Sequence, residues 1–70
     1  MEIDAKSSDG NAFSIMGHVL TLLKETDRMD EWPGFQERML GDGYDNLCDV
    51  AEEATYGVIT VVNRPDKRPD

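Results

Sequence analysis

Hydrophobic positions follow a helical period most clearly in residues 12–26, which read AFSIMGHVLTLLKET. Apolar residues recur there at intervals of three or four, at Phe13, Met16, Leu20 and Leu23. This spacing predicts an amphipathic helix with an apolar stripe wide enough to face more than one neighbour. Asp9 and Asn11 are candidate N-caps. Gly17 interrupts the helix at a cost of about 1 kcal/mol, and we expect compensation from close approach of another backbone, within the chain or across a dimer.

Two shorter helices are predicted downstream. The first runs from Trp32 to Leu40 and carries Pro33 near its start, where the missing N–H is not needed. The second is expected to follow Asp42 as its N-cap, with Asp45 in the first turn, where a carboxylate suits the helix dipole. The inward side of this last helix is predicted to comprise Tyr44, Leu47, Cys48, Ala51 and Ala54 or Thr55.

The two ends of the chain favour β-structure. Residues 1–6 alternate between apolar and charged side chains, and residues 58–62, VITVV, are mostly β-branched. Each strand is the natural partner of the other, because the segments between them are helical. We therefore predict one α+β domain over residues 1–63, small and mostly helical, with three helices and a short two-stranded ribbon formed by the N- and C-terminal strands. Residues 64–70, RPDKRPD, are too polar to pack and are predicted to be a disordered tail.

The charge of the chain narrows the class of partner. Its 70 residues include 15 acidic and 7 basic side chains, a formal net charge of −8. A field of this sign repels nucleic acids and anionic membranes, so we expect neither as a direct partner and favour a basic protein surface. The apolar runs are too short to span a bilayer, and no secretory signal pattern is present. These features, with Cys48 as the only cysteine, predict a cytoplasmic protein without an intramolecular disulfide. Because so short a chain buries a limited core, a homodimer would add stability.

No pattern of residues points to catalysis, a cofactor or a metal. The only histidine, His18, lies off the main apolar stripe, and no serine has an evident base. An EF-hand loop that starts at Asp42 would place Tyr44 at a ligand position and Leu47 at the invariant glycine, and a start at Asp45 also fails. We therefore predict a protein that is not an enzyme and holds no cofactor.

The segment GDGYDNLCDVAEEAT, residues 41–55, is acidic throughout and contains no lysine or arginine. Its five carboxylates form the predicted partner-binding site: Asp42, Asp45, Asp49, Glu52 and Glu53. Carboxylates at i, i+4 and i+7 of a helix are about 6 Å apart, similar to the phosphates of one DNA strand. Such a row can compete for a phosphate-binding groove on another protein. A solvated helix face is the alternative, and the sequence leaves both open.

Two motifs, GNAF-x-IMG at residues 10–17 and YDNL at residues 44–47, resemble a family of small proteins encoded by tailed phages and prophages. The family pattern reads Gly-Asp-Tyr-Asp-x-Leu-Leu, whereas here Gly43 follows the aspartate and Cys48 replaces the second leucine. The resemblance covers about two thirds of the chain and transfers no activity.

The resemblance implies a small acidic phage accessory protein in the host cytoplasm. Such a protein would bind stoichiometrically and inhibit or modulate a host nucleic-acid-binding or defence complex, as anti-CRISPR and DNA-mimic proteins do. The alternative is a structural or assembly protein that self-associates through apolar surfaces. Its candidate surfaces are the first helix and the edges of the terminal ribbon.

Overall fold

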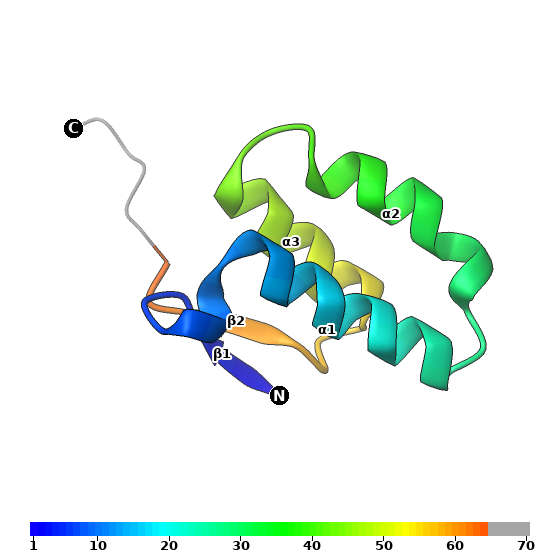
Figure 1. The fold of residues 1–70 in the computed structure, drawn as a ribbon, viewed down its shortest axis with the longest axis horizontal. Coiled ribbons are helices and arrows are strands. Elements are labelled where there is room, and N and C mark those ends of the chain that lie inside the picture. The colour runs from blue at the N-terminus through cyan, green and yellow to red at the C-terminus, as the bar shows by residue number, and fades with distance from the viewer. Residues whose placement is uncertain (65–70) are drawn as a thin grey trace.

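The computed structural model describes residues 1–64 and confirms the predicted fold class (Figure 1). In chain order the elements are β1 (Glu2–Asp4), a 3₁₀ turn (Ser8–Gly10), α1 (Ala12–Glu25), a second 3₁₀ turn (Met29–Glu31), α2 (Trp32–Met39), α3 (Tyr44–Ala54) and β2 (Thr60–Val62). The central element is α3, which contacts α1, α2 and β2. Residues 65–70, the remainder of the predicted tail, lie outside the described residues.

The ribbon joins the two ends of the chain in a parallel arrangement, with Ile3 of β1 opposite Val61 of β2. A parallel pair needs a long crossover connection, and all three helices lie within it. Both strands are shorter than predicted. The first gives way to a turn in which the Asp4 side chain accepts the Lys6 N–H at 2.9 Å, and the second is delayed because the Ile59 N–H donates to the Thr55 hydroxyl at 3.1 Å.

Helix α1 begins as predicted but buries a different part of its apolar stripe. The Asn11 side chain caps it by accepting the Ser14 N–H at 2.9 Å. The residues buried are Ile15, Met16, Val19 and Leu23. Of the four residues that define the predicted stripe, Met16 and Leu23 are therefore buried, whereas Phe13 is 84% exposed and Leu20 only half-buried. A second apolar line, through Ile15 and Val19, has the same spacing of three to four residues, and the positions of α3 and the ribbon decide which line is covered.

The start of α3 differs from the prediction. Asp42 is not its N-cap, because Gly43 occupies that position and no side chain caps the helix. Gly43 has a φ of 91°, a conformation that glycine adopts at little cost, and it reverses the chain between α2 and α3. Its carbonyl accepts the Leu47 N–H at 3.0 Å. Asp45 lies in the first turn of the helix, as predicted.

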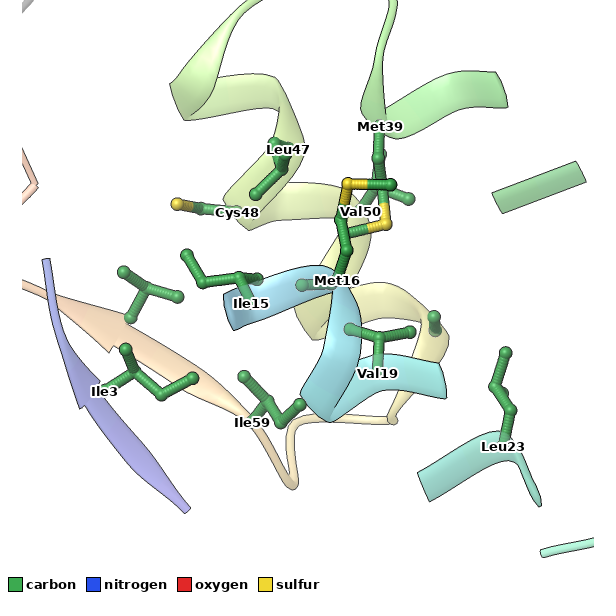
Figure 2. Packing of buried hydrophobic residues seen from close by; sticks show 13 residues of the cluster. Ile3, Ile15, Met16, Val19, Leu23, Met39, Leu47, Cys48, Val50 and Ile59 are labelled. Atoms are coloured by element: carbon green, nitrogen blue, oxygen red, sulfur yellow. The ribbon is translucent and has the colours of Figure 1, made fainter. Parts of the chain in front are cut away.

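The hydrophobic core forms where α1, α3 and the ribbon meet, and α2 closes one side (Figure 2). The predicted inward face of α3 is confirmed for Leu47, Cys48, Ala51, Ala54 and Thr55, and Val50 is buried with them. Tyr44 is half-buried and donates its hydroxyl hydrogen to the Gly10 carbonyl. This bond ties the start of α3 to the turn before α1.

Two glycines illustrate opposite constraints. A Cβ at Gly10 would collide with the backbone of Ala5, so the turn before α1 requires glycine. A Cβ at Gly17 would meet nothing within 4 Å. The predicted close approach of another backbone to Gly17 is therefore wrong within the described chain. Close approach of a second copy's backbone to Gly17 in a dimer stays a prediction.

Candidate partner-binding surface

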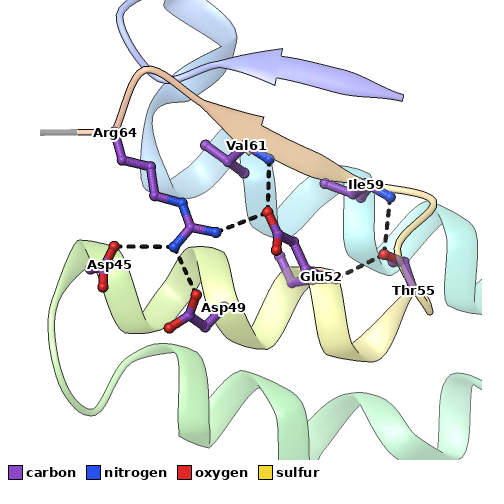
Figure 3. A network of polar contacts seen from close by, with 8 residues as sticks. Asp45, Asp49, Glu52, Thr55, Ile59, Val61 and Arg64 are labelled. Carbon is purple, nitrogen blue, oxygen red and sulfur yellow. Dashed lines mark hydrogen bonds and ion pairs between the residues drawn. The ribbon is translucent and has the colours of Figure 1, made fainter.

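The outward face of α3 brings three of the five predicted carboxylates together around one guanidinium group. Arg64, two residues after the end of β2, extends back over α3 and lies between these carboxylates (Figure 3). Its Nη1 is 3.1 Å from an oxygen of Asp45 and 2.7 Å from one of Asp49. Its Nη2 is 2.8 Å from Glu52 Oε2.

Helical spacing explains the convergence of these carboxylates. Asp45, Asp49 and Glu52 stand at i, i+4 and i+7, so they share one side of α3, the side along which β2 emerges. Glu52 Oε2 also accepts the Val61 N–H at 3.0 Å, which attaches the strand to the helix. Glu52 therefore orients both the backbone of β2 and the side chain of Arg64.

Repulsion between the carboxylates along α3 is relieved by arginines that lie far away in the sequence. The segment itself contains no basic residue, but Arg64 approaches from β2 and Arg38 from α2. Arg38 donates to both oxygens of Glu53, at 2.7 and 2.8 Å. This hydrogen bond lowers the pKa of Glu53 below its ordinary 4.5 and raises the pKa of Arg38. The row is therefore partly compensated within the chain, and the choice between a partner-binding row and a solvated helix face stays open.

The five predicted residues consequently fall into three environments. Asp45, Asp49 and Glu52 form one group with Arg64, and Glu53 faces α2. Asp42 lies exposed in the turn before α3 and makes no ion pair within residues 1–64. Together the five carboxylates and two guanidinium groups keep a formal charge of −3. Partner binding by these five residues stays a prediction.

Arg64 is held firmly for a residue near the end of the described chain. Its side chain is 21% exposed, and partial burial lowers its pKa. Hydrogen bonds with Asp49, Asp45 and Glu52 act more strongly in the other direction, and the net result is a raised pKa. The guanidinium therefore stays charged throughout the physiological pH range. Sequence reasoning assigned Arg64 to the tail, and its position two residues after a predicted strand was the one available signal of a structural role.

A second surface feature was not predicted from the sequence. A cavity of about 140 Å³ lies between the C-terminal ends of α1 and α3 and the loop before β2. Its lining comprises Leu22, Leu23, Thr26, Arg28, Ala54, Thr55, Tyr56 and Val58. The Arg28 guanidinium lies 4.5 Å from the centre of the Tyr56 ring and donates to the Ala54 carbonyl at 2.9 Å. The apolar cavity thus has a rim made of an arginine and a tyrosine.

Other chemical candidates are limited in the described part of the chain. Burial raises the pKa of the Cys48 thiol, which disfavours the reactive thiolate. No group of three or more His, Cys, Asp or Glu side chains within residues 1–64 could hold a metal ion. None of the helices over this range is both long and apolar enough to cross a membrane.

Comparison of the chain with protein-family models, with curated proteins and with solved structures gives no match. The function of the protein is therefore inferred from the surfaces of the molecule.

Proposed function

We propose that this chain is a non-catalytic binding protein that attaches stoichiometrically to an arginine-bearing basic surface of a partner protein. The observation that carries this proposal is the convergence of Asp45, Asp49 and Glu52 on one guanidinium. Carboxylates arranged in this way bind arginine through short, charge-assisted hydrogen bonds. The biological form of the proposal is a phage accessory protein that acts in the host cytoplasm on a nucleic-acid-binding or defence complex.

The proposed partner contact has to form beside Arg64 or in its place. The side chain of Asp49 is 64% exposed and that of Asp45 is 46% exposed, so both present accessible surface. Three carboxylates around one guanidinium leave two negative charges in excess. A second basic group is therefore attracted to the same face. Since Arg64 is tethered to β2, it competes at a high effective concentration and favours partners with several basic side chains.

Charge reversal tests this proposal. The variant Asp45→Lys/Asp49→Lys leaves Glu52 in place to hold β2, and we expect it to lose partner capture from host cells. The control variant, Asp9→Lys/Glu37→Lys, changes net charge equally at two exposed positions outside α3 that make no ion pair within residues 1–64. Circular dichroism establishes that both variants fold. Equal capture by both variants would refute a role for the α3 face.

Salt dependence supplies a second measurement in the same experiment. Interactions between exposed charges weaken as the Debye length falls from about 10 Å at 0.1 M to about 3 Å at 1 M salt. Capture through the α3 face should accordingly fall between these concentrations. Capture that is insensitive to salt would assign the contact to apolar surfaces instead.

The alternative function, assembly through apolar self-association, is favoured by a different observation. Phe13 is 84% exposed on α1, and Gly17, one turn further along the helix, has open space around it. This combination allows a second copy to approach α1 closely. Sedimentation over a wide concentration range tests it, because the assembly should dissociate on dilution and on Phe13→Ser substitution. A monomer at every concentration would exclude this function.

A further inference from the structure

The cavity between α1 and α3 is distinct from the carboxylate group on the outward face of α3. Its volume of about 140 Å³ is similar to that of engineered cavities that bind one benzene molecule. It can therefore receive a single large apolar side chain, such as leucine or phenylalanine. Leu22 and Val58 supply apolar surface from opposite sides, from α1 and from the loop before β2.

The two threonines and the arginine of the lining already have hydrogen-bond partners. The Thr26 hydroxyl donates to the Leu22 carbonyl at 2.8 Å, and the Thr55 hydroxyl donates to the Ala51 carbonyl at 2.9 Å. Arg28 donates to the Ala54 carbonyl and to Glu31. A polar ligand would find few hydrogen-bonding groups there, so the complementary ligand is apolar.

The rim has the composition of an interaction hot spot. Tyr56 is 81% exposed and stacks with Arg28, and the half-exposed Val58 follows it. Tyrosine and arginine next to an apolar pocket are enriched at the energetic centres of protein interfaces. Tyr56 also has a φ of 52°, an unfavourable conformation for a residue with a side chain, so its exposed position is imposed by the chain reversal after α3.

Charge complementarity identifies the occupant. Helix α1 ends in Glu25, the segment that follows it into the rim has Asp27, Asp30 and Glu31 against one basic residue, Arg28, and the chain as a whole carries −8. A second copy would bring the same negative charge, which disfavours it as the occupant. Residues 65–70, the part of the chain outside the described structure, contain prolines as their only apolar residues and offer no large side chain. A basic segment with one apolar side chain satisfies both the charge and the shape.

We infer that this cavity is an anchor site for one large apolar side chain carried on a basic segment of a partner protein. The inference rests on the proposed function, to which it adds a second contact at the end of α3. The carboxylates attract the basic segment and the cavity selects its apolar residue. Binding would therefore depend on a feature that DNA-like charge alone does not provide.

Two synthetic peptides of equal charge test the inference. One is Gly-Lys-Gly-Lys-Phe-Lys-Gly-Lys-Gly and the other has Ala in place of Phe, each titrated into isotope-labelled protein. We expect the Phe peptide to bind about tenfold more tightly, because burial of the ring adds to the charge attraction. The largest shifts should fall on the methyl groups of Leu22 and Val58. Val58→Ser should reduce its affinity to that of the Ala peptide, whereas Leu40→Ser, at another exposed apolar position that lies outside the cavity, should not.

The alternatives give different results. Equal affinity of the two peptides, or no binding of the Phe peptide, would overturn the anchor site. Binding of free toluene in the cavity without peptide binding would redefine it as a small-molecule site. Shifts of Leu22 and Val58 that depend only on protein concentration would assign it to a second copy. In each case the capture experiment with Asp45 and Asp49 variants still decides the proposed function separately.

Discussion

Replacement of Arg64 by alanine tests a three-carboxylate contact between the last described residue and helix α3. The substitution removes ion pairs to Asp45, Asp49 and Glu52 and leaves their carboxylates facing one another. It also removes side-chain packing, because the arginine is only 21% exposed. We expect the variant to fold with lower stability and with a loosened β2.

The size of the effect follows from the exposure of the three partners. Exposed ion pairs contribute about 0.2–1 kcal/mol each. Asp49 and Asp45 belong at the low end, since their side chains are 64% and 46% exposed, and Glu52, at 33%, belongs higher. With the repulsion left among the carboxylates, the expected loss is about 1–2 kcal/mol of the free energy of unfolding in low salt. About half of that loss should remain in 1 M NaCl, where exposed charges are screened.

Urea denaturation followed by Trp32 fluorescence measures this loss, because Trp32 packs against the core and urea does not screen charge. Arg64→Lys should be intermediate, since an ammonium keeps the charge but lacks the planar fork that reaches several carboxylates. In an Asp49→Asn background the Arg64→Ala effect should shrink, because one partner is already neutral. An unchanged midpoint for Arg64→Ala in low salt would refute the contact.

Three further substitutions test individual contacts. Gly17→Ala should raise the free energy of unfolding by about 1 kcal/mol, whereas Gly10→Ala should lower it by about 3 kcal/mol, because the added methyl group collides with the backbone. Chemical denaturation measures both changes, and equal effects of the two substitutions would contradict the structure. Thr55→Val should cost about 1–3 kcal/mol, because it leaves a buried N–H without its acceptor, and faster amide exchange at the start of β2 would accompany the loss. The ion pair between Glu53 and Arg38 stabilises the fold above pH 4.5, and this effect is lost as the pH falls through the lowered pKa of Glu53. In an NMR titration, Arg38→Gln should return the titration midpoint of Glu53 towards 4.5, and an unchanged midpoint would exclude the pair.

Local patterns predicted most of the fold because each element carries its own signal. Pro33 marked the start of α2, and the β-branched run before residue 63 identified the strand that pairs with β1. The Asn11 cap was also among the predicted candidates, and a short polar side chain before an apolar run is a local feature. These predictions needed no knowledge of the tertiary structure.

The errors arose where two local readings were equally good. Both Phe13 and Ile15 begin an apolar line on α1, and the positions of α3 and the ribbon decide that Ile15 is the buried one. Asp42 is a favourable N-cap in isolation, but the reversal between α2 and α3 requires a positive φ, which Gly43 supplies one residue later. In each case a constraint from outside the helix determined the outcome.

The candidate site shows the same limit more strongly. The sequence located the five carboxylates, but the cations that face them come from residues far along the chain, 15 positions away for Arg38 and Glu53. No periodicity within α3 contains that information. Arg64 was assigned to a tail on the basis of its polar neighbours, although a charged residue next to a strand can reach whatever that strand packs against.

The pairing of Arg64 changes what the acidic face of α3 can recognise. An uncompensated row of carboxylates would attract any polycation through its field alone. With one guanidinium already in place, a second basic group either binds beside Arg64 to the remaining negative charge or displaces it, and displacement requires new ion pairs stronger than those that Arg64 gives up. Under the proposed function, this competition would favour an arginine-rich protein surface over diffuse cations. The apolar cavity at the other end of α3 would strengthen such selectivity, because the side chain that we propose it anchors carries no charge.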